Sequence, residues 1–162
     1  MKVTIVRETG DLASKERISC SGALFYARNT QRILFLQKSN GKHQGTWGVV
    51  GGTNEDQETP WQGLLREIQE EIGDHPPILK AVPIETFVSN DKVFNFHTYL
   101  CIVDEEFVPT LSIEHTGWCW ATMDYAPKPL HQGLRNSFNN RIIRTKLETI
   151  FEVLDLIVKH RM

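Results

Sequence analysis

The segment TPWQGLLREIQEEIG constrains the fold more than any other part of the chain, because it specifies both ends of one helix. Thr59 is a favourable N-cap residue, and Pro60 suits the first helical position. Gln62 stands three residues after Thr59, as a capping box requires. Gly73 fits a C-terminal cap, and the two prolines shortly beyond it prevent continuation. The sequence therefore predicts a helix over residues 60–72.

This predicted helix carries two distinct faces. Its bulky apolar side chains, placed at about 100° per residue, fall in one arc of the kind that faces a core: Trp61, Leu64, Leu65, Ile68 and Ile72. Glu67, Glu70 and Glu71 fall in a second arc, and their i, i+3, i+4 spacing lets the carboxylates converge. A glutamate pair at i, i+4 destabilises a helix by roughly a few tenths of a kcal/mol unless something neutralises it. An ordinary solvated face, with Arg66 paired to Glu70, is the alternative.

The approach to the helix favours a cation between these glutamates. Residues 41–58 are rich in glycine and polar residues, so we expect mostly loop with a short extended piece at 47–50. Gly48, Gly51 and Gly52 let the backbone approach a ligand closely. Carboxylate and carbonyl oxygens suit Mg²⁺, which also keeps waters and contacts substrate phosphates. The sequence thus predicts a divalent cation site at this helix.

The same residues resemble the sequence box of the Nudix hydrolase family. That box has a glycine, five residues, a glutamate, seven residues and then Arg-Glu-U-x-Glu-Glu-x-Gly-U, where U is a bulky aliphatic residue. Here it runs from Gly52 through Glu58 to REIQEEIG at 66–73, and every charged and glycine position matches. Two positions depart from the pattern, because Asp74 replaces the last aliphatic residue and Val50 replaces a proline common in the lead-in. Both concern packing or backbone conformation more than chemistry.

The resemblance implies a fold, a reaction and a cofactor. Family members have a loop–helix–loop motif inside an α/β/α sandwich. With Mg²⁺ or Mn²⁺ they hydrolyse a nucleoside diphosphate linked to another group. The metal ligands that the resemblance implies are Glu67, Glu70, Glu71 and a backbone carbonyl of Gly51 or Gly52. Arg66 matches the arginine that orients the glutamates, and Glu58 matches its partner. The prediction is a metal-dependent pyrophosphohydrolase.

Hydrolysis needs a carboxylate that takes a proton from the attacking water. Glu70 and Glu71 are candidates within the box. Glu114 is a candidate of the kind that some family members carry on a loop after the sheet. The sequence leaves the choice among the three open.

Candidates for substrate binding are less specific. Lys42 and Lys38 precede the glycine-rich loop, and Arg28 is a candidate by position alone. The histidine candidates for phosphate contact, with an ordinary surface position as the alternative for each, are His43, His97, His115 and His131. The aromatic candidates for stacking on a base, with core packing as the alternative for each, are Phe25, Phe87, Phe94 and Trp118.

The rest of the chain predicts an α+β fold, with a mixed sheet between helices and one domain over residues 1–162. Residues 1–12 are expected to hold a strand followed by charged residues, and further strands are expected at 17–27, 32–39, 77–89, 92–104 and 117–123. Residues 130–138 are predicted as a loop or short helix. Apolar residues at helical spacing predict a core-packing helix over 139–160.

Composition limits the classes of binding partner and the cellular compartment that can be expected for this chain. The formal net charge of −2 gives no general attraction to nucleic acid or acidic membranes, which leaves an RNA 5′ end as an alternative substrate. The 3 cysteines are widely spaced without a CxxC pair, so a disulfide framework or zinc site is not expected. No apolar run approaches the roughly 20 residues of a membrane span, and the N-terminus lacks a signal-peptide core. We expect a cytoplasmic protein.

The substrate stays open at this level. ADP-ribose, dinucleoside polyphosphates, nucleotide sugars and nucleoside triphosphates all carry the required bond. Residues 86–93 lack the strings that mark some family subgroups, which argues against an NADH-type enzyme. A nucleotide-sensing domain without turnover is a further alternative, although no box glutamate is lost. Homodimers are common in the family, and the sequence does not decide whether this chain forms one.

Overall fold

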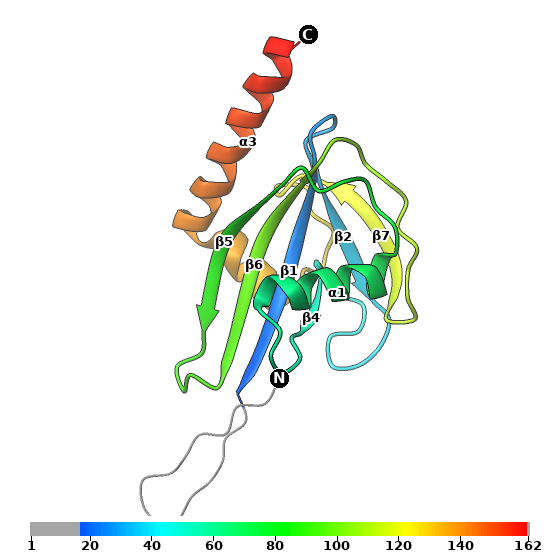
Figure 1. Cartoon of the computed structure of the whole chain (residues 1–162), viewed down its shortest axis with the longest axis vertical. Coiled ribbons are helices and arrows are strands. Elements are labelled where there is room, and N and C mark those ends of the chain that lie inside the picture. The colour runs from blue at the N-terminus through cyan, green and yellow to red at the C-terminus, as the bar shows by residue number, and fades with distance from the viewer. Residues whose placement is uncertain (1–16, 162) are drawn as a thin grey trace, which may run out of the picture.

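The computed structural model describes residues 17–161, which form a mixed β-sheet flanked by helices (Figure 1). The elements of this part of the chain are β1 (Ile18–Ala27), β2 (Arg32–Lys38), β3 (Trp47–Gly48), β4 (Val50–Thr53), α1 (Pro60–Ile72), β5 (Lys80–Val88), β6 (Phe94–Val103), β7 (His115–Ala121), α2 (Gln132–Asn139) and α3 (Arg141–Arg161). The strand predicted for residues 1–12 lies outside the described residues.

Strand β1 is the centre of the sheet. One of its edges pairs in parallel with β6 along the whole strand, from Ile18 opposite Phe94 to Ala27 opposite Val103. Strand β5 then pairs antiparallel with β6. The other edge of β1 is divided, since residues 20–23 pair with β4 and only the end of the strand pairs with β2. Strands β3 and β7 both pair with β2, so the sheet is mixed, as predicted.

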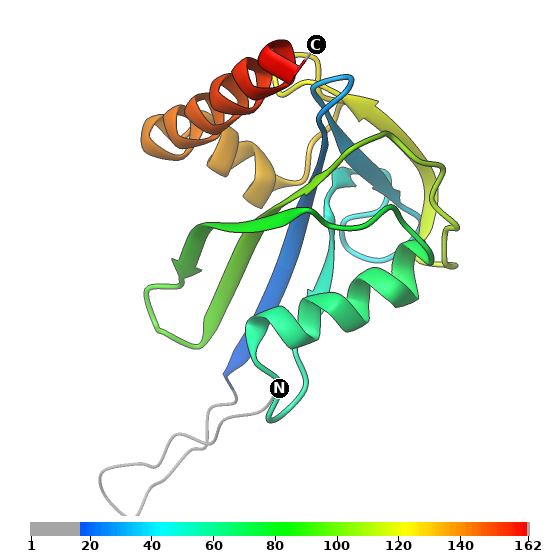
Figure 2. The same ribbon diagram turned by 45° about the horizontal axis from the view of Figure 1, so that its top comes forward.

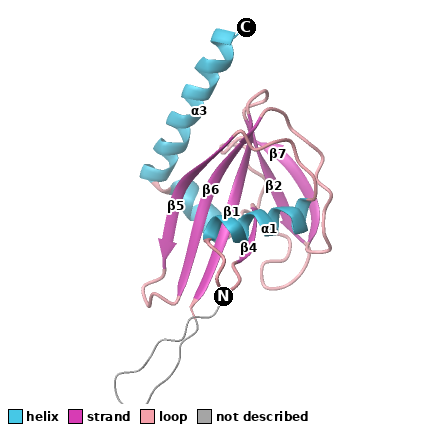
Figure 3. Cartoon of the chain, in the orientation of Figure 1, coloured by secondary structure: helices cyan, strands magenta, loops and turns pink. Residues whose placement is uncertain are grey.

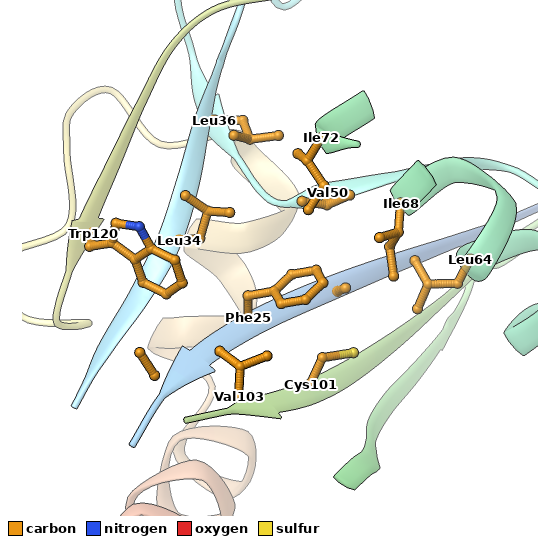
Figure 4. Close-up of a cluster of buried hydrophobic side chains, with 12 residues drawn as sticks. Phe25, Leu34, Leu36, Val50, Leu64, Ile68, Ile72, Cys101, Val103 and Trp120 are labelled. Atoms are coloured by element: carbon orange, nitrogen blue, oxygen red, sulfur yellow. The ribbon is translucent and has the colours of Figure 1, made fainter. Parts of the chain in front are cut away.

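Helix α1 covers one face of the sheet, and α2 and α3 cover the other (Figures 2 and 3). Side chains alternate along each strand and therefore feed two separate cores. The core beneath α1, drawn in Figure 4, contains among others Phe25, Leu34, Leu36, Val50, Leu64, Ile68, Ile72, Cys101 and Trp120. The core beneath α2 and α3 contains among others Leu24, Tyr26, Phe35, Leu100, Phe138 and Leu147. The predicted α/β/α sandwich of the α+β class is confirmed.

Helix α1 has the predicted bounds because both of its caps form. Thr59 Oγ1 accepts a hydrogen bond from the backbone N–H of Gln62 at 3.1 Å, and Gln62 Oε1 accepts one from the N–H of Thr59 at 3.0 Å. At the other end, Gly73 has φ of 65°, a left-handed conformation that glycine adopts without strain. Local signals alone therefore set where this helix begins and ends.

The approach to α1 differs from the prediction. The extended piece expected at 47–50 is two short strands, and β4 continues to Thr53. Gly51 and Gly52 thus lie in a strand that pairs with β1 rather than in a loop. A Cβ on Gly51 would come within 2.2 Å of the carbonyl oxygen of Ser21. The two strands approach too closely here for a side chain, which is the physical reason for a glycine.

The helices on the other face follow each other directly. Helix α2 forms in the segment predicted as loop or short helix, and α3 follows it after Asn140. Asn140 Oδ1 accepts hydrogen bonds from the N–H groups of Ile142 and Ile143 at 3.0 and 3.2 Å, which starts α3. Leu147 is fully buried, so the predicted core contact of α3 is present. No helix within residues 17–161 is long and apolar enough to cross a membrane.

A buried polar cluster fixes the N-terminal end of α1 against β1. The amide Nδ2 of Asn54 donates to the hydroxyls of Ser19 and Ser21 at 3.0 and 3.1 Å. Ser21 Oγ in turn lies 2.9 Å from the carbonyl oxygen of Pro60, the first residue of α1. Gly63 packs on Asn54 so closely that a Cβ would lie 2.1 Å from Asn54 Oδ1. This cluster sets the distance between the helix and the sheet.

We predict that Asn54→Ala lowers the free energy of unfolding by about 1–3 kcal/mol, because it leaves the two serine hydroxyls without their buried donor. Urea denaturation followed by circular dichroism measures the change. Asn90→Ala, at an exposed turn, is the matched control and should stay within about 0.5 kcal/mol of the wild type. Equal stability of the two variants would contradict a structural role for the cluster.

Candidate active site

Arg66 is the hub that holds the acidic residues of α1 in place. Its guanidinium donates to the carboxylate of Glu58 at 3.0 Å, to Glu67 at 3.0 Å and to the backbone oxygen of Thr53 at 3.0 Å. Hydrogen bonds from Arg66 hold the pKa of Glu58 below its usual value, and Glu58 raises the pKa of Arg66. The pairing of Arg66 with Glu58 that the resemblance implied is present, and it ties the loop before α1 to the middle of the helix.

Glu71 is the one buried carboxylate of α1, with 3% of its surface exposed. Its Oε2 accepts a hydrogen bond from the backbone N–H of Gly51 at 2.8 Å. Burial, reinforced by the charges of Glu67 and Glu114, raises the pKa of Glu71 to about 8. The protein therefore places an acidic group where it is costly to ionise without a nearby cation.

Glu67 lies against the strand that carries the box glycines. A Cβ on Gly52 would fall within 2.5 Å of the Glu67 carboxyl carbon, so position 52 has no room for a side chain. The pKa of Glu67 is raised by burial, and Arg66 opposes this shift. The absence of a side chain at Gly52 leaves the Glu67 carboxylate directly beside the backbone of β4.

Glu114 reaches the site from a loop distant in sequence. The carboxylates of Glu71 and Glu114 and a ring nitrogen of His115 lie within 4.8 Å of one another. The loop is positioned by the open end of α1, since the N–H of Thr110 donates to Ile72 O at 2.9 Å and that of Ser112 donates to Glu71 O at 3.2 Å. Carbonyls that a helix end leaves without partners thus draw the loop across the acidic face.

Glu70 occupies a different position from the other glutamates. Its side chain is 59% exposed and accepts from Arg66 at 3.3 Å. It lies at the rim of the site beside Glu67, while Glu71 lies inside. Its predicted roles as a metal ligand and a proton acceptor stay predictions.

The donor set fits a hard divalent cation. Glu71 and Glu114 supply carboxylate oxygens and His115 supplies a ring nitrogen, all within 4.8 Å of one another. The Glu67 carboxylate lies beside β4, and its charge reaches Glu71. Oxygen ligands of this kind suit Mg²⁺ or Mn²⁺ better than thiolate-preferring metals. The raised pKa values of Glu67 and Glu71 point the same way, because a bound dication would stabilise their ionised forms. These residues form a possible metal-binding group.

A cavity of about 550 Å³ opens beside the acidic group. Its lining includes Glu71, Gly51 and Gly52 from the site just described. The basic part of its wall includes Lys38, His43, His115 and His131, and the ring centroids of His43 and His131 lie 4.5 Å apart. The aromatic part includes Phe87, Phe94, Phe96 and Phe138. The cavity therefore joins an acidic, a basic and an aromatic surface.

A family model described as the NUDIX domain matches residues 18–140. The chain belongs to the Nudix family. The matched segment includes the whole of the acidic helix, Glu114 and helix α2.

Two sequence relatives and one solved structure illustrate the relationship. The Nudix chain is 32% identical over 114 residues to a dihydroneopterin triphosphate diphosphatase from Haemophilus influenzae, covering 61% of this chain and 70% of the relative. It is 66% identical over 42 residues to an 8-oxo-dGTP diphosphatase from Proteus vulgaris, covering 25% of this chain and 38% of the relative. A Nudix hydrolase structure from M. smegmatis has a TM-score of 0.65 at 20% identity, covering 85% of this chain and 87% of that one. The predicted identity as a Nudix pyrophosphohydrolase is confirmed.

The structure corrects the substrate contacts predicted for this Nudix enzyme. Phe25 is fully buried in the core beneath α1, where its ring centroid lies 5.6 Å from that of Phe107, so it cannot stack on a substrate. Arg28 follows the far end of β1 and forms an ion pair with Asp104. Lys42 is exposed and does not line the cavity, whereas Lys38 does. Lys42 and Arg28 were predicted from their positions in the sequence alone, and for Phe25 the alternative of core packing holds.

The sequence identified only some of the other residues that line the cavity. Phe87 and Phe94 line the cavity, as one of the two interpretations of their aromatic rings held, while Trp118 does not. Phe96 was missed, although its spacing of two from Phe94 places both on one face of a strand. Glu85 was missed as well, and no sequence pattern marks it.

The raised pKa of Glu71 predicts an unusual dependence of stability on pH. Between the ordinary carboxyl pKa of 4.5 and about 8, the folded protein keeps a proton on Glu71 that the unfolded chain has released. The contribution of Glu71 to the free energy of unfolding is therefore fully present at low pH and is lost as the pH rises through about 8. We predict that, in EDTA, the melting temperature of the wild type falls between pH 6 and 9 relative to that of Glu71→Gln, which carries no titrating group at this position.

Differential scanning fluorimetry at several pH values gives the difference between the two proteins, which removes contributions common to both. A second series in Mg²⁺ tests the cause, since a dication favours the ionised form and should reduce the loss of stability at high pH. Parallel pH profiles of the two proteins in EDTA would contradict a proton on Glu71.

Proposed function

We propose that this Nudix protein hydrolyses an organic triphosphate to a monophosphate and diphosphate. The observation that carries the proposal is the group of Glu71, Glu114 and His115, with the charge of Glu67 nearby, beside a cavity with basic and aromatic walls. The names of two relatives, a dihydroneopterin triphosphate diphosphatase and an 8-oxo-dGTP diphosphatase, support this substrate class over the others that the sequence left open.

The charges of the reactants set the requirements of the reaction. A triphosphate is strongly anionic and so are the carboxylates that face it, so they repel each other in water. Mg²⁺ or Mn²⁺, when bound, would neutralise phosphate charge and make water more acidic at neutral pH. Glu67 and Glu71, with a carbonyl of Gly51 or Gly52, are the proposed ligands, and Glu70 is a further ligand at the rim. Arg66 keeps the glutamates in register.

The remaining steps fall to residues of the chain itself. Water adds to one phosphorus, the bond from that phosphorus to the bridging oxygen breaks, and a carboxylate accepts the proton of the water. Glu114 suits this last role best, because it is exposed and adjoins Glu71. Glu71 is held by the Gly51 N–H and is better placed to bind a cation. Lys38, His43 and His131 would hold the phosphate chain.

A panel of substrates tests the proposal. It contains dihydroneopterin triphosphate, 8-oxo-dGTP, the ordinary deoxynucleoside triphosphates, ADP-ribose, a dinucleoside tetraphosphate, a nucleotide sugar and an RNA with a 5′ triphosphate, each with Mg²⁺ or Mn²⁺. We expect release of diphosphate from a free triphosphate as the fastest reaction, measured with and without added inorganic pyrophosphatase. Preference for ADP-ribose or the RNA would contradict the proposed class, and tight binding without any turnover would favour a sensing domain.

We predict that Glu71→Gln lowers turnover by at least about 100-fold with the fold intact, because the amide keeps the shape but not the charge of a ligand. The kcat on the best substrate of the panel and the circular dichroism spectrum are the two measurements. Glu105→Gln, an exposed glutamate in the turn after β6, is the matched control and should keep wild-type turnover. Near-normal turnover of the Glu71 variant would refute the role given to this residue.

A small-molecule nucleotide or related triphosphate is therefore the proposed partner of the cavity. Location in the cytoplasm, a single domain over residues 1–162 and a homodimer stay predictions from the sequence.

A further inference from the structure

A β-bulge in β5 turns one acidic side chain into the cavity. Pro83 lies opposite Tyr99 of β6, but the next pair is Glu85 opposite Thr98, so Ile84 is an extra residue in the strand. A residue of this kind shifts the alternation of side chains between the two faces. As a result Ile84 and Glu85 both line the cavity, where a regular strand would have sent one of them to the opposite face.

Helix α3 holds this bulge in place. The ammonium group of Lys146 donates to the carbonyl oxygens of Pro83 and Ile84 at 2.8 and 3.3 Å. Backbone carbonyls that a bulge removes from the regular ladder thus receive a charged donor. The direction of the Glu85 side chain is therefore set by the fold and does not depend on a flexible loop.

The Glu85 carboxylate faces the cavity with unused acceptor capacity. Ser137 Oγ on α2 donates to its Oε1 at 2.9 Å and fixes its orientation. Within residues 17–161, no lysine or arginine forms an ion pair with it. A carboxylate has two oxygens with about four lone-pair sites, so one hydroxyl leaves most of them open. Such a group binds best to a pair of adjacent N–H donors.

Two amides of α2 and its C-cap complement this carboxylate. Asn136 Oδ1 accepts from Gln132 Nε2 at 2.8 Å, and Asn140 Oδ1 accepts the N–H groups that begin α3. Because their oxygens are already used, both residues offer N–H groups to the cavity that they line. The rings of Phe87, Phe94 and Phe96 supply a flat apolar surface nearby.

We propose that Glu85 determines specificity by recognising a 2-amino-4-oxopyrimidine edge, the edge that guanine and pterin rings share. This edge offers a ring N–H and an adjacent amino group to the carboxylate, and a carbonyl oxygen to an amide donor. Adenine and cytosine place an unprotonated ring nitrogen beside the amino group, which repels a carboxylate. The inference rests on the proposed function in one respect, which is that the ring enters the cavity as part of a triphosphate.

Binding of product-like ligands tests the inference without turnover. Isothermal titration would measure the affinities of GMP, inosine monophosphate, AMP and neopterin monophosphate for the wild type, Glu85→Gln and Glu85→Ala. Inosine monophosphate lacks only the amino group of GMP. We expect the wild type to bind GMP about tenfold or more tightly than inosine monophosphate, and Glu85→Gln to lose this preference, because its amide presents N–H groups to the donors of the ring.

Thr86→Ala is the matched control, since Thr86 is the next residue of β5 and contacts His97. It should keep the wild-type preference, and melting curves should show that all variants are folded. The affinities for GMP and neopterin monophosphate show whether the cavity prefers a purine or a pterin ring with this edge. Equal affinity of the wild type for GMP, inosine monophosphate and AMP, or an unchanged preference in Glu85→Gln, would overturn the inference.

Kinetics separate this inference from the proposed function. On dGTP or 8-oxo-dGTP, Glu85→Gln should raise KM about tenfold with little change in kcat, because the proposed contact of Glu85 is with the ring and not with the phosphates. If no triphosphate is hydrolysed but binding still depends on Glu85, the proposed function fails and the recognition stands. If triphosphates are hydrolysed with the same KM by both proteins, the recognition fails and the proposed function stands.

Discussion

A buried carboxylate, that of Glu71, is the constraint on which the site depends. An ionised group at this depth needs compensation, and the hydrogen bond from the Gly51 N–H provides only part of it. Several features of the chain follow from this requirement. Strand β4 lies close to β1 because glycine stands at position 51, and Glu67 fits beside the strand because glycine stands at 52. The residues of the Nudix box therefore set the course of the backbone as well as the positions of the charges.

The two layers of helices have different roles in the site. Helix α1 carries the acidic groups and is fixed at one end by Asn54 and at the other by the loop that presents Glu114. Helices α2 and α3 lie on the opposite face and contribute the wall that a substrate ring would meet. Chemistry and specificity can therefore change independently on one sheet, which suits a family whose relatives are named for different triphosphates.

Local signals in the sequence predicted much of this architecture. The caps at Thr59 and Gly73 set the bounds of α1, and the spacing of its glutamates indicated an acidic face. Alternation in residues 94–100 predicted β6. These features depend on neighbours within a few residues, so a single sequence contains them.

The features that the sequence did not predict depend on contacts between distant segments. Whether Phe25 faces a core or a cavity depends on which helix covers that side of β1, and it proved to face the core. The bulge at Ile84 arises from the register between β5 and β6 and from Lys146 on α3. Glu114 could be predicted as a candidate through the family resemblance, but its approach to Glu71 depends on backbone bonds to the end of α1.

Anomalous diffraction from a crystal soaked in Mn²⁺ locates the cation without reference to turnover, and so tests whether the buried carboxylate of Glu71 belongs to a metal site. We expect an anomalous peak roughly 2–2.5 Å from carboxylate oxygens of Glu67 and Glu71, with Glu114 facing it. A peak elsewhere in the molecule, or none at this cluster at millimolar Mn²⁺, would contradict a metal site at these glutamates.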